Sequence, residues 1–96
     1  MSATPLEEAE AAFREVLAES VARAAVLLAD VHPADATDWL QDCEEDDRHR
    51  LFSAISPEIQ AGILEHADEA FTQVLIARLD ASHLRDVLEE LSLIHI

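Results

Sequence analysis

Carboxylates are the side chains of this protein best suited to chemistry, and five of them fall within six consecutive positions: Asp42, Glu44, Glu45, Asp46 and Asp47. Hard cations such as Mg²⁺ and Ca²⁺ are bound by carboxylate oxygens. The D-x-D-x-D-G pattern of a calcium-binding loop is missing. Acids also complement the dipole at the start of a helix. The stretch therefore predicts either a plain helix start or a weak, incomplete Mg²⁺ site with these five residues as candidate ligands.

The histidines do not predict a metal site. His32, His49, His66 and His83 recur every 17 residues, a spacing that differs from the twelve-residue period of the apolar residues. We therefore expect the four side chains to point in different directions and to form no common site. Neither H-E-x-x-H nor C-x-x-C occurs in the sequence, which disfavours zinc.

No group of residues predicts catalysis. Serine does not occur in a G-x-S-x-G context, and no nucleophile stands beside an evident base. Cys43 and Trp39 occupy apolar positions of the repeat, so we expect both in the core. Gly62 falls inside a predicted helix, where glycine is unfavourable, and the close approach of a neighbouring helix is the expected reason. The protein is not predicted to be an enzyme.

Composition limits the classes of function. With 96 residues the chain forms one domain, and six basic against 21 acidic residues give a net charge of −15. Such a charge repels nucleic acids and anionic membranes, so neither is an expected partner. The longest apolar run, Ala24 to Ala29, is too short to span a membrane, and no signal peptide is evident. The expected compartment is the cytoplasm.

A twelve-residue repeat organises the sequence from Ser20 to Leu91, which divides into six units without a gap. Positions eight, nine and twelve of every unit are apolar, and this spacing places them on one face of a helix. Position eight is Leu27, Trp39, Leu51, Ile63, Leu75 and Val87; position nine is Leu28, Leu40, Phe52, Leu64, Ile76 and Leu88; position twelve is Val31, Cys43, Ile55, Ala67, Leu79 and Leu91.

Each unit predicts one short helix followed by a tight turn. Four units begin with a residue that favours the N-cap, and two have proline at the first helical position; these are Ser20, Ser56, Asp68 and Asp80, and Pro33 and Pro57. Helices of eight or nine residues are marginal alone and must stack on their neighbours. The prediction is an all-α solenoid, preceded by one longer helix over Thr4 to Ala29 that caps it. Periodicity leaves the hand of the solenoid open.

Three segments resemble the cytosolic N-terminal domain of MgtE-type magnesium transporters. They are LADVHPADATDWL (Leu28 to Leu40), AISPEIQAGIL (Ala54 to Leu64) and LRDVLEELS (Leu84 to Ser92). The resemblance implies a right-handed superhelix of short helices on the cytosolic face of the plasma membrane. It also implies that paired CBS modules and a membrane channel follow, and that the domain closes on the CBS modules when shared carboxylates bind Mg²⁺.

The sequence departs from the family pattern at two places. The family often has Glu where Gly62 stands, and its next unit continues with acids where this chain ends in Ile94-His95-Ile96. The predicted organisation is therefore residues 1–19 as part of the capping helix, 20–91 as the repeat domain and 92–96 as a truncated or non-native tail. Lacking a seventh unit, the sixth should expose Val87, Leu88 and Leu91, with the tail folded loosely over them.

Two functions follow from these observations. The first is a regulatory Mg²⁺-sensing domain that gates an MgtE-type pore through CBS modules of the same polypeptide. The alternative is a metal-independent interaction module, similar to the middle domain of the flagellar motor-switch protein, which has comparable short-helix repeats. The apolar end also predicts self-association, with a homodimer as an expected form.

Overall fold

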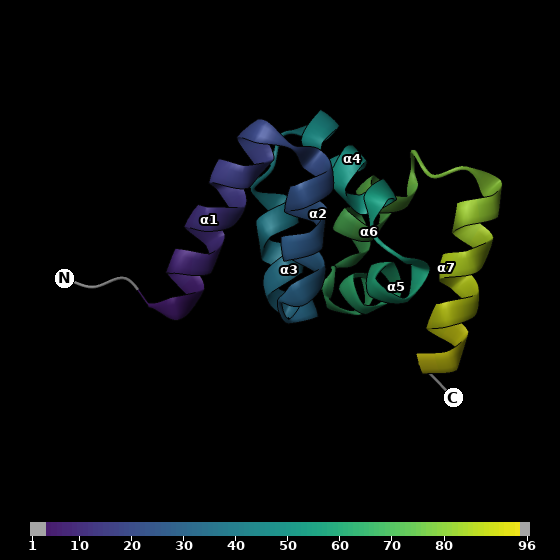
Figure 1. Ribbon diagram of the computed structural model, residues 1–96. Coiled ribbons are helices and arrows are strands. Elements are labelled where there is room, and N and C mark those ends of the chain that lie inside the picture. Colours follow the sequence, from purple (N-terminus) through teal and green to yellow (C-terminus); the bar gives the residue numbers. More distant parts are fainter. Residues whose placement is uncertain (1–3, 95–96) are drawn as a thin grey trace.

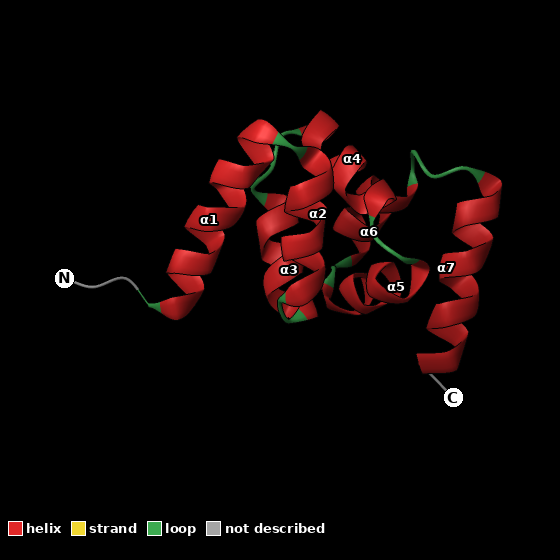
Figure 2. Cartoon of the chain, viewed as in Figure 1, coloured by secondary structure: helices red, strands yellow, loops and turns green. Residues whose placement is uncertain are grey.

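The computed structural model describes residues 4–94 and consists of helices joined by short turns (Figure 1). No strand occurs among these residues (Figure 2), which confirms the all-α prediction. The helices are α1 (Pro5–Glu19), α2 (Val21–Asp30), α3 (Pro33–Gln41), α4 (Glu45–Ala54), α5 (Pro57–His66), α6 (Glu69–Ile76) and α7 (Ala81–Ile94). From α3 onward each helix begins twelve residues after the previous one.

Capping residues determine where the helices begin. The hydroxyl of Ser56 accepts a hydrogen bond from the Ile59 amide, and the carboxylate of Asp68 accepts one from Phe71. Each bond satisfies one of the amides left unpaired in the first turn of a helix. The caps predicted at Ser20, Ser56, Asp68 and Asp80 all form. Pro33 and Pro57 occupy the first helical position as predicted.

The prediction of a single helix over Thr4 to Ala29 is wrong, because Ser20 interrupts the helix and separates α1 from α2. This residue is extended, with φ −157° and ψ 117°. Its amide donates to the Val16 carbonyl and so closes α1, while its hydroxyl accepts from the Arg23 amide and caps α2. One serine thereby satisfies two helix ends. The break allows α1 and α2 to pack against each other, which a continuous helix could not do.

Alternate helices pack together in two rows. In one row α3 contacts α5 and α5 contacts α7, and in the other α2 contacts α4 and α4 contacts α6. The molecule is elongated, about 43 Å by 26 Å by 22 Å, with α1 and α7 at its two ends (Figure 1). The right-handed superhelical path of the solenoid stays a prediction.

Two buried polar side chains tie neighbouring helices together. The hydroxyl of Thr37 in α3 donates chiefly to the Pro33 carbonyl of the same helix, at 2.7 Å, and it also lies 3.2 Å from the Ile63 carbonyl of α5. Gln60 of α5 donates from its side-chain amide to the Phe52 carbonyl of α4, at 2.6 Å. Buried hydrogen-bonding groups are costly when unpaired, so the bond of Gln60 to Phe52 favours the observed placement of α5 relative to α4.

The apolar columns of the repeat form the core. Of their eighteen members only Leu88 is exposed. Trp39 and Cys43 are buried as predicted, and the ring of Trp39 lies against Phe13 of α1 with 5.1 Å between ring centroids. Stacking is therefore what buries the single apolar face of each short helix.

The C-terminal end differs from the prediction. Val87, expected to be partly exposed, is completely buried, because α7 packs on α5. Leu88 is 53% exposed, as expected, and Leu91 is half-buried. Residues Ser92 to Ile94 continue α7 instead of folding back, and residues 95 and 96 of the predicted tail lie outside the described residues. None of the helices in the described part has the length and apolar character needed to cross a membrane.

Candidate functional site

The five candidate acids lie on the turn between α3 and α4. Asp42 is the C-cap of α3 and Glu44 the N-cap of α4, while the other three belong to the first turn of α4. All are exposed except Asp47, which is half-buried. Glu44 makes no side-chain cap hydrogen bond, so its carboxylate is not held by its own helix. The turn therefore presents a dense set of carboxylates to solvent.

Arg48 holds this turn in place from its inner side. Its Nε donates to the Leu40 carbonyl at 2.8 Å, and its Nη2 donates to the carbonyls of Gln41 at 3.0 Å and Cys43 at 2.8 Å. These carbonyls lie at and just beyond the end of α3, where the helix leaves acceptors unpaired. The guanidinium also lies 5.4 Å from the ring centroid of Phe71 in α6. Arg48 thus connects three helices at the acidic turn.

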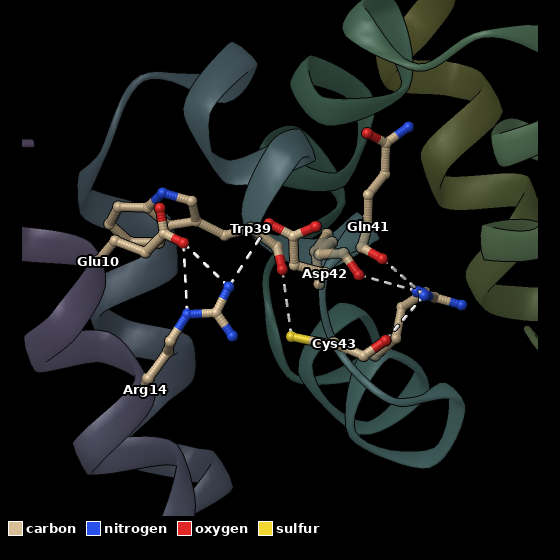
Figure 3. Close-up of polar contacts among 8 residues, drawn as sticks. Glu10, Arg14, Trp39, Gln41, Asp42 and Cys43 are labelled. Atoms are coloured by element: carbon tan, nitrogen blue, oxygen red, sulfur yellow. Dashed lines mark hydrogen bonds and ion pairs between the residues drawn. The ribbon is translucent and has the colours of Figure 1, made fainter. Parts of the chain in front are cut away.

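A second arginine contacts the turn from α1. Arg14 Nη2 lies 2.9 Å from Glu10 Oε2 and 3.5 Å from Asp42 Oδ2. Figure 3 shows the guanidinium of Arg14 between these two carboxylates. The pKa of Arg14 is raised, chiefly by the hydrogen bond with Glu10 and further by the charge of Asp42. One candidate ligand is therefore already engaged with a cation, although both side chains remain largely exposed.

A third arginine contacts the acidic turn from the segment that follows α6. Arg78 Nη1 lies 3.4 Å from Asp46 Oδ1, and the Asp46 side chain is 78% exposed. A pocket of about 330 Å³ opens beside this pair, lined in part by Glu45, His49 and Phe52. Exposed pairs of this kind stabilise a fold by about 0–1 kcal/mol. Arg78 therefore places little restraint on Asp46.

The acids of the turn do not assemble a complete metal site. Within residues 4–94 no group of three or more His, Cys, Asp or Glu side chains is placed to hold a metal ion. Mg²⁺ requires near-octahedral oxygen geometry, but it commonly keeps several waters and uses one or two carboxylates. The turn is therefore suited to supply some of the ligands of a Mg²⁺ site whose other ligands come from a second surface. The assignment of Asp42, Glu44, Glu45, Asp46 and Asp47 as ligands stays a prediction.

Two of the four regularly spaced histidines meet, contrary to the expectation from their spacing. The rings of His32 and His66 lie edge to face with 5.5 Å between centroids. His32 precedes α3 and its Nδ1 accepts a hydrogen bond from the Ala34 amide, while His66 ends α5. Packing of α3 on α5 brings these two helix ends together, which the twelve-residue repeat alone does not reveal.

Cys43 is a buried thiol at the base of the turn. Its Sγ donates to the Trp39 carbonyl at 3.2 Å (Figure 3). Burial, which disfavours the charged thiolate, raises the pKa of Cys43. A thiol that stays protonated is a poor nucleophile and a poor metal ligand. This agrees with the core role expected for this residue.

Sequence reasoning missed the part played by Arg48. Its only sequence signal is an arginine in the first turn of α4, closely following the last residues of α3. Arginine with its five donors is suited to several carbonyls at once, but which carbonyls it meets depends on the angle between the two helices.

A known protein family matches the larger part of the chain. The family model described as the MgtE intracellular N domain matches residues 31–95, which is about two thirds of the chain. This span includes the acidic turn and excludes α1 and α2. No curated protein and no solved structure matches the chain.

Proposed function

Since this chain belongs to the family of MgtE intracellular N domains, we propose that it is the Mg²⁺-sensing, regulatory domain of an MgtE-type magnesium transporter. The family match over residues 31–95 carries this proposal. This family is one of regulatory transporter domains and not one of enzymes. The acidic turn within the matched span is the surface we assign to sensing.

The sensing step follows from the charge and incompleteness of this turn. The chain carries a net charge of −15, so it repels other acidic surfaces at low ionic strength. Mg²⁺ bound between carboxylates of two surfaces would remove part of that repulsion and link them. Because the turn supplies only scattered carboxylates within residues 4–94, the domain needs a partner surface to bind Mg²⁺ well.

We propose CBS modules of the same polypeptide as that partner. In this proposal, the domain associates with the CBS modules when Mg²⁺ is abundant and separates when Mg²⁺ is scarce. The association holds the pore shut and its loss permits opening. Arg48 acts as a positioning residue, because its hydrogen bonds to the carbonyls of Leu40 and Cys43 fix the backbone that carries the acids.

The test is a calorimetric titration with MgCl₂ at constant ionic strength, with and without a purified pair of MgtE-type CBS modules. We expect the chain alone to bind Mg²⁺ only weakly, in the millimolar range or above. With the CBS modules present, we expect association that requires Mg²⁺. Association of equal strength in EDTA would contradict the proposal and favour the metal-independent interaction module. Saturable micromolar binding to the chain alone would show that it holds a complete site.

Matched variants test whether the acidic turn is responsible for the Mg²⁺-dependent association. Neutralising the turn with Glu44→Gln and Glu45→Gln should weaken the Mg²⁺-dependent association at least about tenfold. The control is Glu7→Gln with Glu8→Gln, which removes the same charge from the exposed first turn of α1. Equal losses in both double variants would mean that only total charge matters and would contradict the assignment of the turn.

A further inference from the structure

The pocket between α4 and the end of α6 gathers positive charge in an otherwise strongly acidic molecule. Its volume is about 330 Å³. The chain has only six basic residues against 21 acidic ones, yet two of the six, Arg48 and Arg78, line this pocket together with His49. Among the described residues, Glu45 is the one acid of the lining. Two arginines and one glutamate leave the lining with a single net positive charge when His49 is neutral.

The rest of the pocket is largely apolar. Phe52 of α4 and Leu75 of α6 are almost completely buried and line its inner side, while Val74, which is 46% exposed, lines its outer side. Pockets of a few hundred Å³ that combine apolar walls with a few polar groups are typical of sites for small molecules. The pocket is therefore suited to a compact apolar body that carries one charged group.

The two arginines differ in how many of their donors are in use. Arg48 donates from Nε and Nη2 to three main-chain carbonyls at the end of α3. The guanidinium of Arg78 makes one contact with the described residues, between its Nη1 and Asp46 Oδ1 at 3.4 Å, and its side chain is 47% exposed. A guanidinium can bind a carboxylate through two of its N–H groups. Arg78 thus has donors left for an anion in the pocket.

We propose that this pocket binds a small monocarboxylate with a compact apolar body, such as an aromatic or branched-chain acid. The apolar body lies against Phe52 and Val74, and the carboxylate accepts hydrogen bonds from Arg78. Arg48 adds its positive charge without giving up its bonds to the end of α3.

The surrounding charges select a ligand with one negative charge. An ammonium group in the same place would be repelled by both arginines of the lining. A dianion would be repelled by Glu45 and by the net charge of −15. A carboxylate that binds Arg78 displaces only Asp46, an exposed partner that contributes little. No Mg²⁺ takes part, so the proposal goes beyond the sensing function and can fail without it.

Amide chemical shifts of the isotope-labelled chain, measured during titration with phenylacetate at constant ionic strength, test the proposal. We expect saturable shifts centred on α4 and α6, with a dissociation constant of about 0.1–1 mM. Benzylamine has the same ring with the opposite charge, acetate lacks the ring, and phenyl phosphate carries nearly two negative charges. Each of these three should bind at least about tenfold more weakly. The proposal is overturned if phenylacetate gives no saturable shifts up to about 10 mM, or if any of the three binds as tightly.

Variants of the charged residues show where the carboxylate binds. Arg78→Gln removes the guanidinium from an exposed turn and should weaken phenylacetate binding at least about tenfold. Asp46→Asn releases Arg78 from its ion pair and should strengthen binding about two- to fivefold. The control is Asp86→Asn, which removes the same charge at an exposed position of α7 and should leave binding close to the original.

Circular dichroism of each variant establishes that its helices are intact, which we expect because all three positions are exposed. Two results contradict the assignment of Arg78. The first is an Arg78→Gln variant that is folded and binds phenylacetate like the original chain. The second is a control variant that gains as much affinity as Asp46→Asn, because total charge alone would then explain the gain.

Discussion

Single residues determine how firmly the acidic turn is held. Arg48 makes three hydrogen bonds to main-chain carbonyls and lies over Phe71, whereas its neighbour Arg50 is exposed. The two arginines belong to the same helix and carry the same charge. They therefore offer a direct comparison between an arginine that supports the backbone and one that does not.

We predict that Arg48→Met destabilises the protein by about 1.5–3 kcal/mol, because it removes three charged hydrogen bonds to main-chain carbonyls, two of them half-buried. Methionine retains much of the aliphatic stem, so the loss reports the guanidinium. Arg50→Met should change the free energy of unfolding by less than about 0.5 kcal/mol. Urea denaturation measures both values, and equal effects of the two substitutions would contradict the role assigned to Arg48.

Cys43 provides a prediction about alkaline pH. Burial raises its pKa in the folded state, so the native protein binds the thiol proton more tightly than the unfolded chain does. The contribution of this thiol to the stability of the folded protein is fully present below the pKa of a cysteine in the unfolded chain, about 8.5. This contribution is lost as the pH rises through the higher pKa of Cys43 in the folded protein. The chain has no Tyr and no Lys, so no other side chain titrates between this thiol and the arginines.

Cys43→Val should accordingly flatten the dependence of unfolding free energy on pH above about 9. Denaturation with urea at several alkaline pH values measures the slope, and the original chain should lose stability over the same range. A variant as sensitive as the original chain would show that the thiol is not responsible.

At the scale of the element, short helices depend on their neighbours. Helices of eight to ten residues bury one face only because alternate helices stack. The contact between α3 and α5 is one example, since a Cβ placed on Gly62 would lie 3.4 Å from Pro33 Cγ. That distance is an ordinary van der Waals contact, and no glycine in the described residues has positive φ. Close approach, as expected for Gly62, is present but leaves room for one methyl group.

We predict that Gly62→Ala stabilises the protein by about 0.5–1 kcal/mol, because alanine loses less backbone entropy than glycine inside a helix. The added methyl also contacts Pro33 without displacing it. Gly62→Val should be less stable than Gly62→Ala, since its branched side chain crowds the same proline. Thermal denaturation ranks the three proteins, and an alanine variant that unfolds below the original chain would contradict this account of the helix contact.

At the scale of the whole molecule, charge opposes folding. A net charge of −15 is spread over 96 residues, and the four arginine–carboxylate pairs of the described region are mostly exposed. Such pairs contribute little, so the repulsion between acids is offset mainly by the core. The elongated shape relieves part of this repulsion by keeping the two ends apart.

We therefore predict that the melting temperature rises when NaCl increases from low to moderate concentration, because salt screens the repulsion. MgCl₂ at the same ionic strength should add little for the chain alone. Differential scanning calorimetry measures both series. A large additional effect of MgCl₂ that persists in about 0.5 M NaCl would reveal a specific site, contrary to the partial site that we assign to the turn.

The sequence by itself determined the short helices from α3 onward, most of their starts and the buried columns. Each of these depends on local chemistry: Ser56 and Asp68 cap whatever helix follows them, and an apolar spacing of one and four residues defines a face in any helix. The family resemblance rested on similar local motifs and was confirmed by the match over residues 31–95. The candidate acids were also correctly expected at a helix start.

Only the tertiary structure decided which helices meet. From its sequence, Ser20 could cap a helix or continue one. In the structure it ends α1 and begins α2, because this interruption lets α1 pack on α2. Likewise, the stacking of α3 on α5 joins His32 to His66, and that of α5 on α7 buries Val87. The reach of Arg48 to the end of α3 has the same origin. These contacts depend on the direction that the chain takes at each turn. Small differences in the backbone dihedral angles determine that direction, and the period of the apolar residues carries no information about them.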